Sequence, residues 1–417
     1  MTHSLRELLG PIKSLLGGTA AFMAGNSLLG VVLPLKMQAA EYSVSLIGLI
    51  MAAYYLGLAY GGLQGKHVIL RIGHIRAFST FAAVMAAACL AYDFLFHPVA
   101  WIGLRFINGF CIAGMTISIE SWLNERSSNV TRGRVLGYYM LVFYLAVALG
   151  QTLVNVTPVA SSDPLMAASA LVALALVPVA MTRLGEPDLG DLSVLGVKAL
   201  FKASAVGVVG AAVAGVLVGS FYALGVVFAR QIGLSVTEAA LFMSTVVVGG
   251  LAAQVPVGLL ADRFDRRIVM ACILLAVGLS WGLLSNSISS GLPLGLLMAM
   301  ALAFGGAISS VYPLCVAQTF DRLDRKYYVA ASGRLLMVYS IGATIGPLLA
   351  STFMATYGPR TFFLFESAIA VLYALYVLFT VTQGRALPME EREKFVPLPD
   401  ISPVAVRMDP RTEPEAE

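Results

Sequence analysis

Twelve apolar stretches, each about as long as a membrane is thick, occupy the sequence from Leu15 to Val381. A helix needs about 20 mostly apolar residues to cross the hydrocarbon core of a bilayer. The composition agrees with this pattern, because 59% of the residues are hydrophobic and 12% are charged. The runs are too long for barrel strands and lack their alternation, whereas helices satisfy their own backbone groups in lipid. The sequence therefore predicts an all-α integral membrane protein.

The predicted spans fall into two groups of six. A central loop, 183–204, separates an N-terminal half (1–182) from a C-terminal half (205–383), and a tail (384–417) follows. The tail is rich in proline and acidic residues, so we expect it to be disordered. The spans are 15–37, 44–65, 77–96, 98–119, 134–155, 164–182, 205–229, 236–259, 268–287, 292–316, 334–355 and 360–381.

The basic residues are distributed unequally between the two sides of the predicted membrane body. Of 27 Lys and Arg residues, only Lys36, Arg230 and Arg360 fall in loops after odd-numbered spans, and Arg105 lies within the fourth span. The others lie on the side shared by both termini, which we call the basic side. Cytoplasmic loops carry such an excess, so we predict a bacterial inner-membrane protein with cytoplasmic termini. The basic clusters then indicate topology and lipid contact, not nucleic-acid binding.

The two halves look like distant copies of each other. Leu104-Arg105-Phe106 in the fourth span matches Leu302-Ala303-Phe304 in the tenth, and Gly133-Arg134 matches Gly333-Arg334. Two six-helix halves in parallel repeat are a transporter layout. Four cysteines lie within spans without metal-site spacing, and no phosphate-binding loop is present. We therefore expect neither an enzyme nor a metal or cofactor.

The strongest motif lies between the eighth and ninth spans and runs from Gly258 to Arg267, with the sequence GLLADRFDRR. It resembles the loop signature of the major facilitator superfamily. The equivalent loop of the first half has Leu70 in place of the acid. We expect the acid to contact the start of the fifth helix, near Gly133 and Arg134, when the basic side is closed. The gating residues predicted here are Gly258, Asp262, Arg263, Arg266 and Arg267.

Other motifs narrow the resemblance to the YcaD-type branch of that superfamily, over about residues 20–380. They include Leu33-Pro34-Leu35, Ala53-Tyr54-Tyr55-Leu56-Gly57, Glu120-Ser121-Trp122 and Ile345-Gly346-Pro347. The resemblance implies two pseudo-symmetric six-helix halves around a central cavity, but it does not name a cargo. In the eleventh span, Gly346 and Pro347 predict a close helix crossing and a hinge.

Arg105 is the charged residue that most clearly predicts function. A guanidinium within a membrane is costly, so it should face the bundle interior or water. The matching residue of the second half is Ala303. A charge needed only for scaffolding would be expected in both halves. We therefore interpret Arg105 as a binding or coupling residue.

Few carboxylates could carry a coupled proton. Glu120 lies near the end of the fourth helix, where it could bind a proton or form an ion pair with Arg126 or Arg134. Glu366 lies inside the twelfth span, and a packed structural acid is the favoured interpretation. The proton-coupling candidates are thus Glu120, Arg105 and Glu366.

The superfamily resemblance implies that the cavity is lined by the first, fourth, seventh and tenth helices, with four more at its sides. Its tyrosines and amides suggest an amphipathic or aromatic organic cargo. The predicted lining residues are Asn26, Tyr54, Tyr55, Arg105, Asn108, Tyr144, Gln151, Tyr222, Gln254, Ser309, Tyr312 and Tyr339.

The sequence predicts a monomeric secondary active transporter that uses alternating access and exports a small organic compound with proton coupling. The first alternative is proton-coupled uptake of an organic anion, with Arg105 binding its carboxylate. A further alternative, a membrane sensor or scaffold without transport, is also open.

Overall fold

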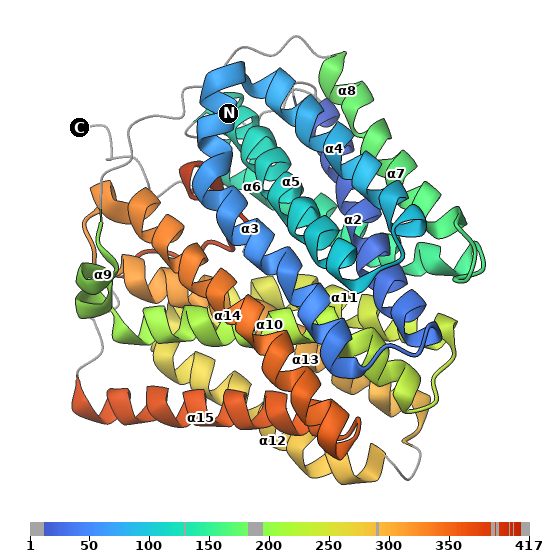
Figure 1. Ribbon diagram of the computed structural model, residues 1–417. Coiled ribbons are helices and arrows are strands. Elements are labelled where there is room, and N and C mark those ends of the chain that lie inside the picture. Colours follow the sequence, from blue (N-terminus) through green and yellow to red (C-terminus); the bar gives the residue numbers. More distant parts are fainter. Residues whose placement is uncertain are drawn as a thin grey trace.

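The computed structural model describes residues 12–128, 131–181, 195–288, 292–384, 388, 392–399, 401–402 and 404–409. In these residues, twelve helical segments are long and apolar enough to cross a membrane. All twelve predicted spans are therefore confirmed as helices. Two six-helix bundles lie against each other, the first in blue to green and the second in yellow-green to red-orange (Figure 1).

The first bundle contains helices that cross the body in alternating directions. They are α2 (Lys13–Ala39), α3 (Val44–Ile72), α4 (His74–Phe94), α5 (Pro98–Glu125), α6 (Arg132–Thr152), and the pair α7 (Asp163–Leu174) and α8 (Leu176–Ala180), which make up the sixth crossing. A short 3₁₀ turn, η1 (Leu153–Asn155), ends the fifth crossing.

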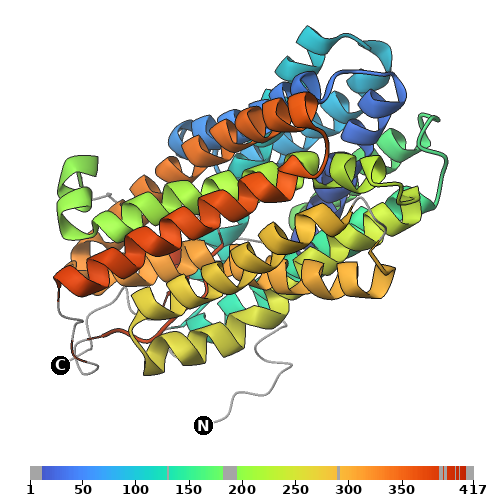
Figure 2. The same cartoon turned by 90° about the horizontal axis from the view of Figure 1, so that it is seen from below.

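The second bundle repeats this order. It contains α10 (Ala205–Gln231), α11 (Val236–Arg263), α12 (Arg266–Ile288), α13 (Leu294–Phe320), α14 (Tyr328–Tyr357) and α15 (Thr361–Gln383). The short elements α9 (Val197–Ala203), η2 (Arg325–Tyr327) and η4 (Val404–Met408) lie outside the crossings. Figure 2 shows the six long helices of this bundle from below.

Several helices continue past the predicted spans on the basic side. The second span was expected to end at residue 65, but α3 runs to Ile72 and α4 begins at His74. The connection is the single residue Gly73, whose φ of 83° is in the left-handed region that suits glycine. Polar residues such as Lys66 do not stop a helix where it leaves the lipid, so hydropathy places its end too early.

Two glycines bring α3 and α5 into backbone contact. A Cβ added to Gly57 on α3 would lie 2.0 Å from the carbonyl oxygen of Phe106, and one added to Gly109 on α5 would lie 1.9 Å from that of Tyr54. No side chain fits between these helices at either point. This contact fixes the position of the residues on α3 and α5 that face the centre of the protein.

The second bundle has the same reciprocal contact between α11 and α13. Gly249 lies against the carbonyl oxygen of Leu302, and Gly305 lies against that of Val246. This packing makes Leu302, rather than Phe304, the counterpart of Phe106. The triplet correspondence expected from sequence is therefore wrong by two residues. The counterpart of Arg105 is Ala301, and the second half still lacks the charge.

The two bundles meet on the side opposite the basic side. Gly48 at the start of α3 lies so close to α14 that an added Cβ would come within 2.8 Å of the carbonyl oxygen of Pro347. The Ser244 hydroxyl on α11 donates to the carbonyl of Ala148 on α6 at 2.9 Å. Helices α3 and α14 converge towards this side and separate towards the basic side (Figure 1). The body is therefore closed on one side and splayed on the other.

The prediction of a disordered tail is wrong for the described part of the chain after α15. In the part that is described, Leu398, Ala405, Val406 and Met408 are buried, and η4 packs against α5, α6 and α14. Composition predicted disorder because the segment has too few apolar residues to fold alone. It is ordered here because the splayed bundles supply the apolar surface. The other tail residues lie outside those described.

Candidate functional site

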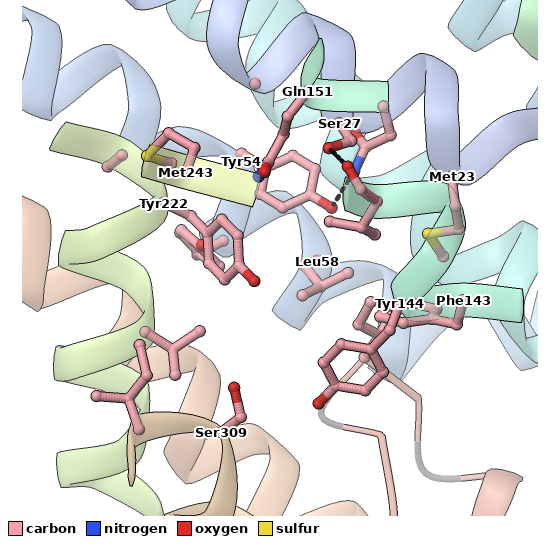
Figure 3. A pocket seen from close by; sticks show the side chains of 18 of the residues that line it. Met23, Ser27, Tyr54, Leu58, Phe143, Tyr144, Gln151, Tyr222, Met243 and Ser309 are labelled. Atoms are coloured by element: carbon pink, nitrogen blue, oxygen red, sulfur yellow. Dashed lines mark hydrogen bonds between the residues drawn. The ribbon is translucent and has the colours of Figure 1, made fainter. Parts of the chain in front are cut away.

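A cavity lies at the centre of the body, between the two bundles. Ten of the twelve predicted lining residues border it: Asn26, Tyr54, Tyr55, Arg105, Tyr144, Gln151, Tyr222, Ser309, Tyr312 and Tyr339. Tyr54, Tyr144, Tyr222 and Ser309 lie around the same open space (Figure 3). The cavity has a volume of about 130 Å³. That is room for several waters or a small organic group.

The two other predicted lining residues are not brought into the cavity. Asn108 is fully buried on α5, where its side-chain oxygen accepts a 2.7 Å hydrogen bond from the Tyr92 hydroxyl. Gln254 on α11 does not border the cavity either. Asn108 follows Arg105 by three residues and so lies about 60° away around the helix axis, which directs its side chain to Tyr92.

Apolar side chains complete the wall, and they were not among the predicted lining residues. Met23, Leu58, Phe143 and Met243 border the cavity beside the tyrosines. For α6 a signal was available: Phe143, Val147 and Gln151 follow one another at intervals of four residues and so share a helix face. Leu398 and Ile401 of the C-terminal segment also border the cavity, and no periodic pattern could have indicated them.

Arg105 is a buried cation at the cavity wall. Only 4% of its surface is exposed, and its guanidinium carbon lies 4.6 Å from the centroid of the Tyr54 ring. Its Nε and Nη1 atoms are buried without a hydrogen-bond partner, and no carboxylate of the described ranges pairs with it. The aromatic face offsets part of the charge. Two unused donors remain for a ligand.

The Tyr54 ring is itself held in place. The Asn26 side-chain amide on α2 donates to the Tyr54 hydroxyl at 3.2 Å, and Tyr55 packs edge-on against the Tyr54 ring. The dashed line that ends at the Tyr54 hydroxyl in Figure 3 is this hydrogen bond. Three helices, α2, α3 and α5, thus bring an amide, an aromatic face and a cation together.

Glu120 lies apart from the cavity, about 22 Å along α5 from Arg105 at the rise of a helix. Its side chain is fully buried, and the Tyr139 hydroxyl on α6 donates to its Oε1 atom at 2.9 Å. Ser402 and the backbone of Ala405 lie beside the same carboxylate. The hydrogen bond therefore comes from a neutral phenol, rather than from Arg126 or Arg134.

Glu366 is buried on α15, away from the central cavity. Apolar residues of α12 and α13 surround it, including Trp281 and Phe304. Neither carboxylate oxygen has a hydrogen-bond partner within the described residues, although the Ser220 side chain is close. This setting agrees with a packed acid rather than a group on the solute path. No group of His, Cys, Asp and Glu in the described part of the chain could hold a metal ion.

A family model described as Major Facilitator Superfamily matches residues 15–193 and 206–407. The chain belongs to this superfamily. It is 26% identical over 372 residues to an uncharacterised MFS-type transporter, YcaD, of Escherichia fergusonii, covering 88% of this chain and 95% of that protein.

The fold is also similar to two solved transporters. The nucleoside transporter NupG gives a TM-score of 0.71 at 16% identity, over 89% of this chain and 99% of NupG. A bacterial homologue of the lysosomal transporter Spinster, in an inward-facing and occupied conformation, gives 0.71 at 15% identity, over 94% and 99%.

As a member of the superfamily, this protein is a secondary transporter, and its signature loop joins α11 to α12. Arg266 is almost fully buried and forms an ion pair with Asp321 at the end of α13, at 2.5 Å. It also lies 3.7 Å from Asp262. Arg267 binds Asp265 with two nitrogens, at 2.9 and 3.2 Å for Oδ2. The arginines thus connect α11, α12 and α13.

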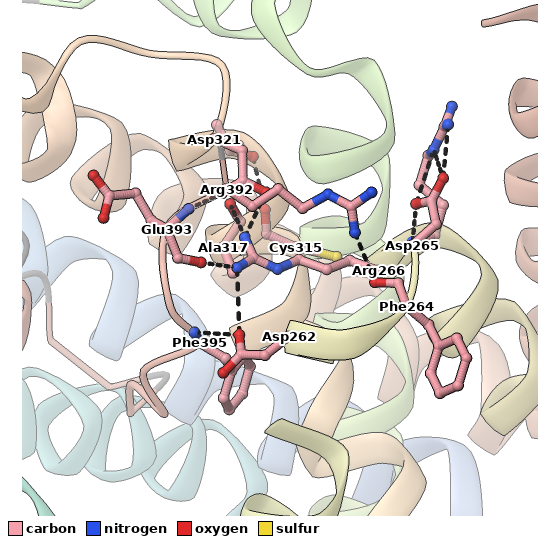
Figure 4. A network of polar contacts seen from close by, with 12 residues as sticks. Asp262, Phe264, Asp265, Arg266, Cys315, Ala317, Asp321, Arg392, Glu393 and Phe395 are labelled. Atoms are coloured by element: carbon pink, nitrogen blue, oxygen red, sulfur yellow. Dashed lines mark hydrogen bonds and ion pairs between the residues drawn. The ribbon is translucent and has the colours of Figure 1, made fainter. Parts of the chain in front are cut away.

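Asp262 of this transporter does not contact the start of α6, where its partner near Gly133 and Arg134 was expected. Its Oδ1 atom instead accepts the backbone N–H of Phe395 at 2.7 Å (Figure 4). A Cβ on Gly258 would lie 2.7 Å from the Phe395 ring. The C-terminal segment therefore contacts two of the predicted gating residues, Gly258 and Asp262, in this conformation. Arg263 lies beside the Phe264 ring.

The glycine–proline motif forms the expected close crossing. An added Cβ on Gly342 would lie 2.1 Å from the Ala212 carbonyl, and one on Gly346 would lie 2.5 Å from that of Val216. Helix α14 continues through Pro347 to Tyr357. The motif thus places α14 directly on α10, and its action as a hinge stays a prediction.

Proposed function

We propose that this transporter carries a small organic solute with an anionic group, which Arg105 binds in the central cavity. The observation that carries this proposal is the buried guanidinium whose Nε and Nη1 atoms have no partner. A buried donor without an acceptor is costly, and a carboxylate or sulfonate on the solute would supply one. The observation supports the organic-anion alternative over a cationic cargo.

The rest of the cavity supports an amphipathic body for that solute. Tyrosines from both bundles and apolar side chains such as Met23 and Phe143 border it. Aromatic rings bind flat organic groups through their faces and leave hydroxyls for polar contacts. The solute would therefore place its anionic group at Arg105 and its apolar part towards Tyr222 and Tyr312.

Alternating access would occur between the closed side and the splayed side. We assign the basic side to the cytoplasm of a bacterial inner membrane, so this conformation opens inward. For the outward-open state, the contact of Ser244 with Ala148 would separate and the basic side would close. Glu120 is the proposed proton site, because it is a fully buried acid near the inner opening whose hydrogen bond comes from Tyr139.

The test of the solute class uses the purified protein and a panel of aromatic acids with matched neutral amides. A ligand that binds only the folded protein raises its melting temperature. We expect stabilisation by acids in the native chain, none in Arg105→Ala, and full stabilisation in Arg360→Ala, which removes an exposed arginine outside the cavity. Equal stabilisation by acids and amides would contradict the proposal.

Direction and coupling are tested in oriented proteoliposomes. An inward proton gradient should drive uptake of the identified solute if the transporter is a symporter. It should drive efflux if the transporter is the exporter that the sequence favoured. A solute flux that is the same with and without the proton gradient would exclude both proton symport and proton-coupled export.

A further inference from the structure

The splayed side of the protein is filled by the chain's own C-terminal segment, meaning here the described residues within 392–409. The segment passes the signature loop, where Phe395 contacts Asp262 and Glu393 contacts Arg266 (Figure 4), and then enters the space between the bundles. Its described residues contact both halves, since η4 packs on α5 and α6 from the first and on α14 from the second. This was the region expected to be disordered.

The first part of the segment is attached to the second bundle by polar contacts. Besides the Phe395 contact with Asp262, the backbone N–H of Glu393 donates to Asp321 at 3.2 Å, and Arg266 donates to the carbonyl of Glu393. The Glu393 side chain forms an ion pair with Arg325 at 2.9 Å. The segment thus uses the same arginine and aspartate that join α11, α12 and α13.

The second part enters the space between the bundles. Leu398 and Ile401 border the central cavity on the basic side, together with Tyr312 and Tyr339. Further along, Ala405, Val406 and Met408 are at most 1% exposed. A solute leaving or entering the cavity on this side would have to pass the positions that these side chains occupy.

We propose that the C-terminal segment is an intramolecular plug, which binds the inward-open conformation, closes its cavity and must leave before solute can pass. The proposal rests on the transport function proposed above. Its binding surface is the groove between α5, α6 and α14 together with the signature loop, and its occupant is residues 392–409 of the same chain.

The contact with Asp262 links the plug to the transport cycle. The superfamily signature led us to expect this carboxylate to contact the start of α6 when the basic side closes. In this structure, the same Oδ1 atom accepts the Phe395 N–H. In addition, the groove between α5, α6 and α14 must narrow when the halves approach. Binding of the plug and closure of the basic side therefore exclude each other.

The plug also covers the proposed proton site. Ser402 and the Ala405 backbone lie beside the Glu120 carboxylate, which is fully buried while they are there. Departure of the segment would expose this carboxylate to the cytoplasmic opening. Release of the plug would thus open the solute path and the proton path together.

The test measures access to the cavity from the basic side with a membrane-impermeant maleimide in inside-out vesicles. The reporter is Ser309→Cys, combined with Cys272→Ser, because Cys272 is exposed and the three other cysteines are buried. Three chains are compared: the full chain, one that ends at Gly384, and one that ends at Asp409. The last is the matched control, since it keeps every described residue of the plug.

We expect labelling to be about tenfold faster in the chain that ends at Gly384, because a tethered segment occupies its site at a high effective concentration. The chain that ends at Asp409 should label at the rate of the full chain. A synthetic peptide of residues 392–409 should slow labelling of the truncated chain again. Equal rates in the full chain and the chain that ends at Gly384 would overturn the proposal.

Point variants of the full chain provide a test that does not depend on truncation. Leu398→Glu places a charge in the apolar cavity wall and should speed labelling, whereas Lys394→Ala changes an exposed side chain of the same segment and should not. An unchanged rate in Leu398→Glu would refute the plug. Solute stabilisation that depends on Arg105 would still stand in that case, so failure of the plug and failure of the proposed function are distinguishable.

Discussion

The guanidinium of Arg105 lies over the ring of Tyr54, with 4.6 Å between its central carbon and the ring centroid. The ring approaches one face of the cation, while Nε and Nη1 remain without partners. Arg105 is thus held in place by a neutral group and keeps its charge for a ligand.

Arg105→Ala is predicted to weaken binding of the anionic solute by about 100-fold, since a hydrogen bond to a charged group contributes about 1.5–3 kcal/mol. Arg105→Lys should recover only part of this, because an ammonium cannot bind a carboxylate with two parallel donors. Isothermal titration with the solute measures both. Full affinity in Arg105→Ala would show that the cation serves another purpose.

Glu120→Gln is predicted to abolish solute-driven proton movement and to leave exchange of solute across the membrane intact. The amide is close in shape to the acid and can keep the contact with Tyr139, but it cannot carry a proton. A pH-sensitive dye and a radiolabelled solute in proteoliposomes measure the two activities. Glu366→Gln is the matched control and should keep both. Proton movement in Glu120→Gln would assign the coupling to another group.

Asp262→Asn is predicted to shift the population towards the inward-open state. The amide can still accept the Phe395 N–H, but it loses the charge expected to hold the start of α6 when the basic side closes. In the chain that ends at Gly384, which lacks the plug, labelling of the cavity cysteine from the basic side should therefore rise. Asp324→Asn, which alters a solvent-exposed acid beside Lys326, should leave labelling unchanged. A fall in labelling in Asp262→Asn would reverse the assignment of states.

Asp265 should make the stability of the signature loop depend on pH. Partial burial opposes its ionisation, but the hydrogen bonds and charge of Arg267 outweigh burial and lower the pKa of Asp265. Its contribution is thus complete above the ordinary carboxyl pKa and is lost as the pH falls through the lowered value. Melting temperatures of the native chain and Asp265→Asn should differ at neutral pH and converge in acid. A constant difference would contradict this.

Gly57→Ala is predicted to destabilise the protein, because the new methyl group would lie 2.0 Å from the Phe106 carbonyl oxygen. Overpacking of this kind costs about 1–3 kcal/mol. Gly62→Ala in the same helix meets nothing within 4 Å and should be neutral or mildly stabilising. Thermal unfolding in detergent compares the pair. A Gly57→Ala variant as stable as Gly62→Ala would show that the helices can move apart freely.

The fold was accessible from sequence because crossing a bilayer demands long apolar runs, which a hydropathy pattern detects directly. Helix ends were less predictable, since α3 continues through the polar residues Lys66 and His67 to Ile72. The repeat was recognised, but its register was wrong. Residue types around Arg105 cannot reveal the backbone contacts of Gly109 and Gly305, which determine the register.

Most of the cavity lining was predicted because superfamily geometry says which helices face the centre. Asn108 was the exception on α5, since the face it occupies points to Tyr92. The C-terminal segment was missed for a different reason. Its composition describes how it behaves alone, whereas its apolar residues, such as Leu398 and Val406, are buried by surfaces that only the assembled bundles create.

The glycine crossings have a mechanical consequence. Where Gly57 and Gly109 place two backbones in direct contact, α3 and α5 have no layer of side chains on which to slide, and Gly249 and Gly305 impose the same restriction on α11 and α13. The pair α3 and α5, and likewise the pair α11 and α13, must therefore move as one rigid body. Relative movement can then occur only at the interfaces between these pairs. At such an interface, the Ser244 hydroxyl can replace its hydrogen bond to the Ala148 carbonyl with one to water.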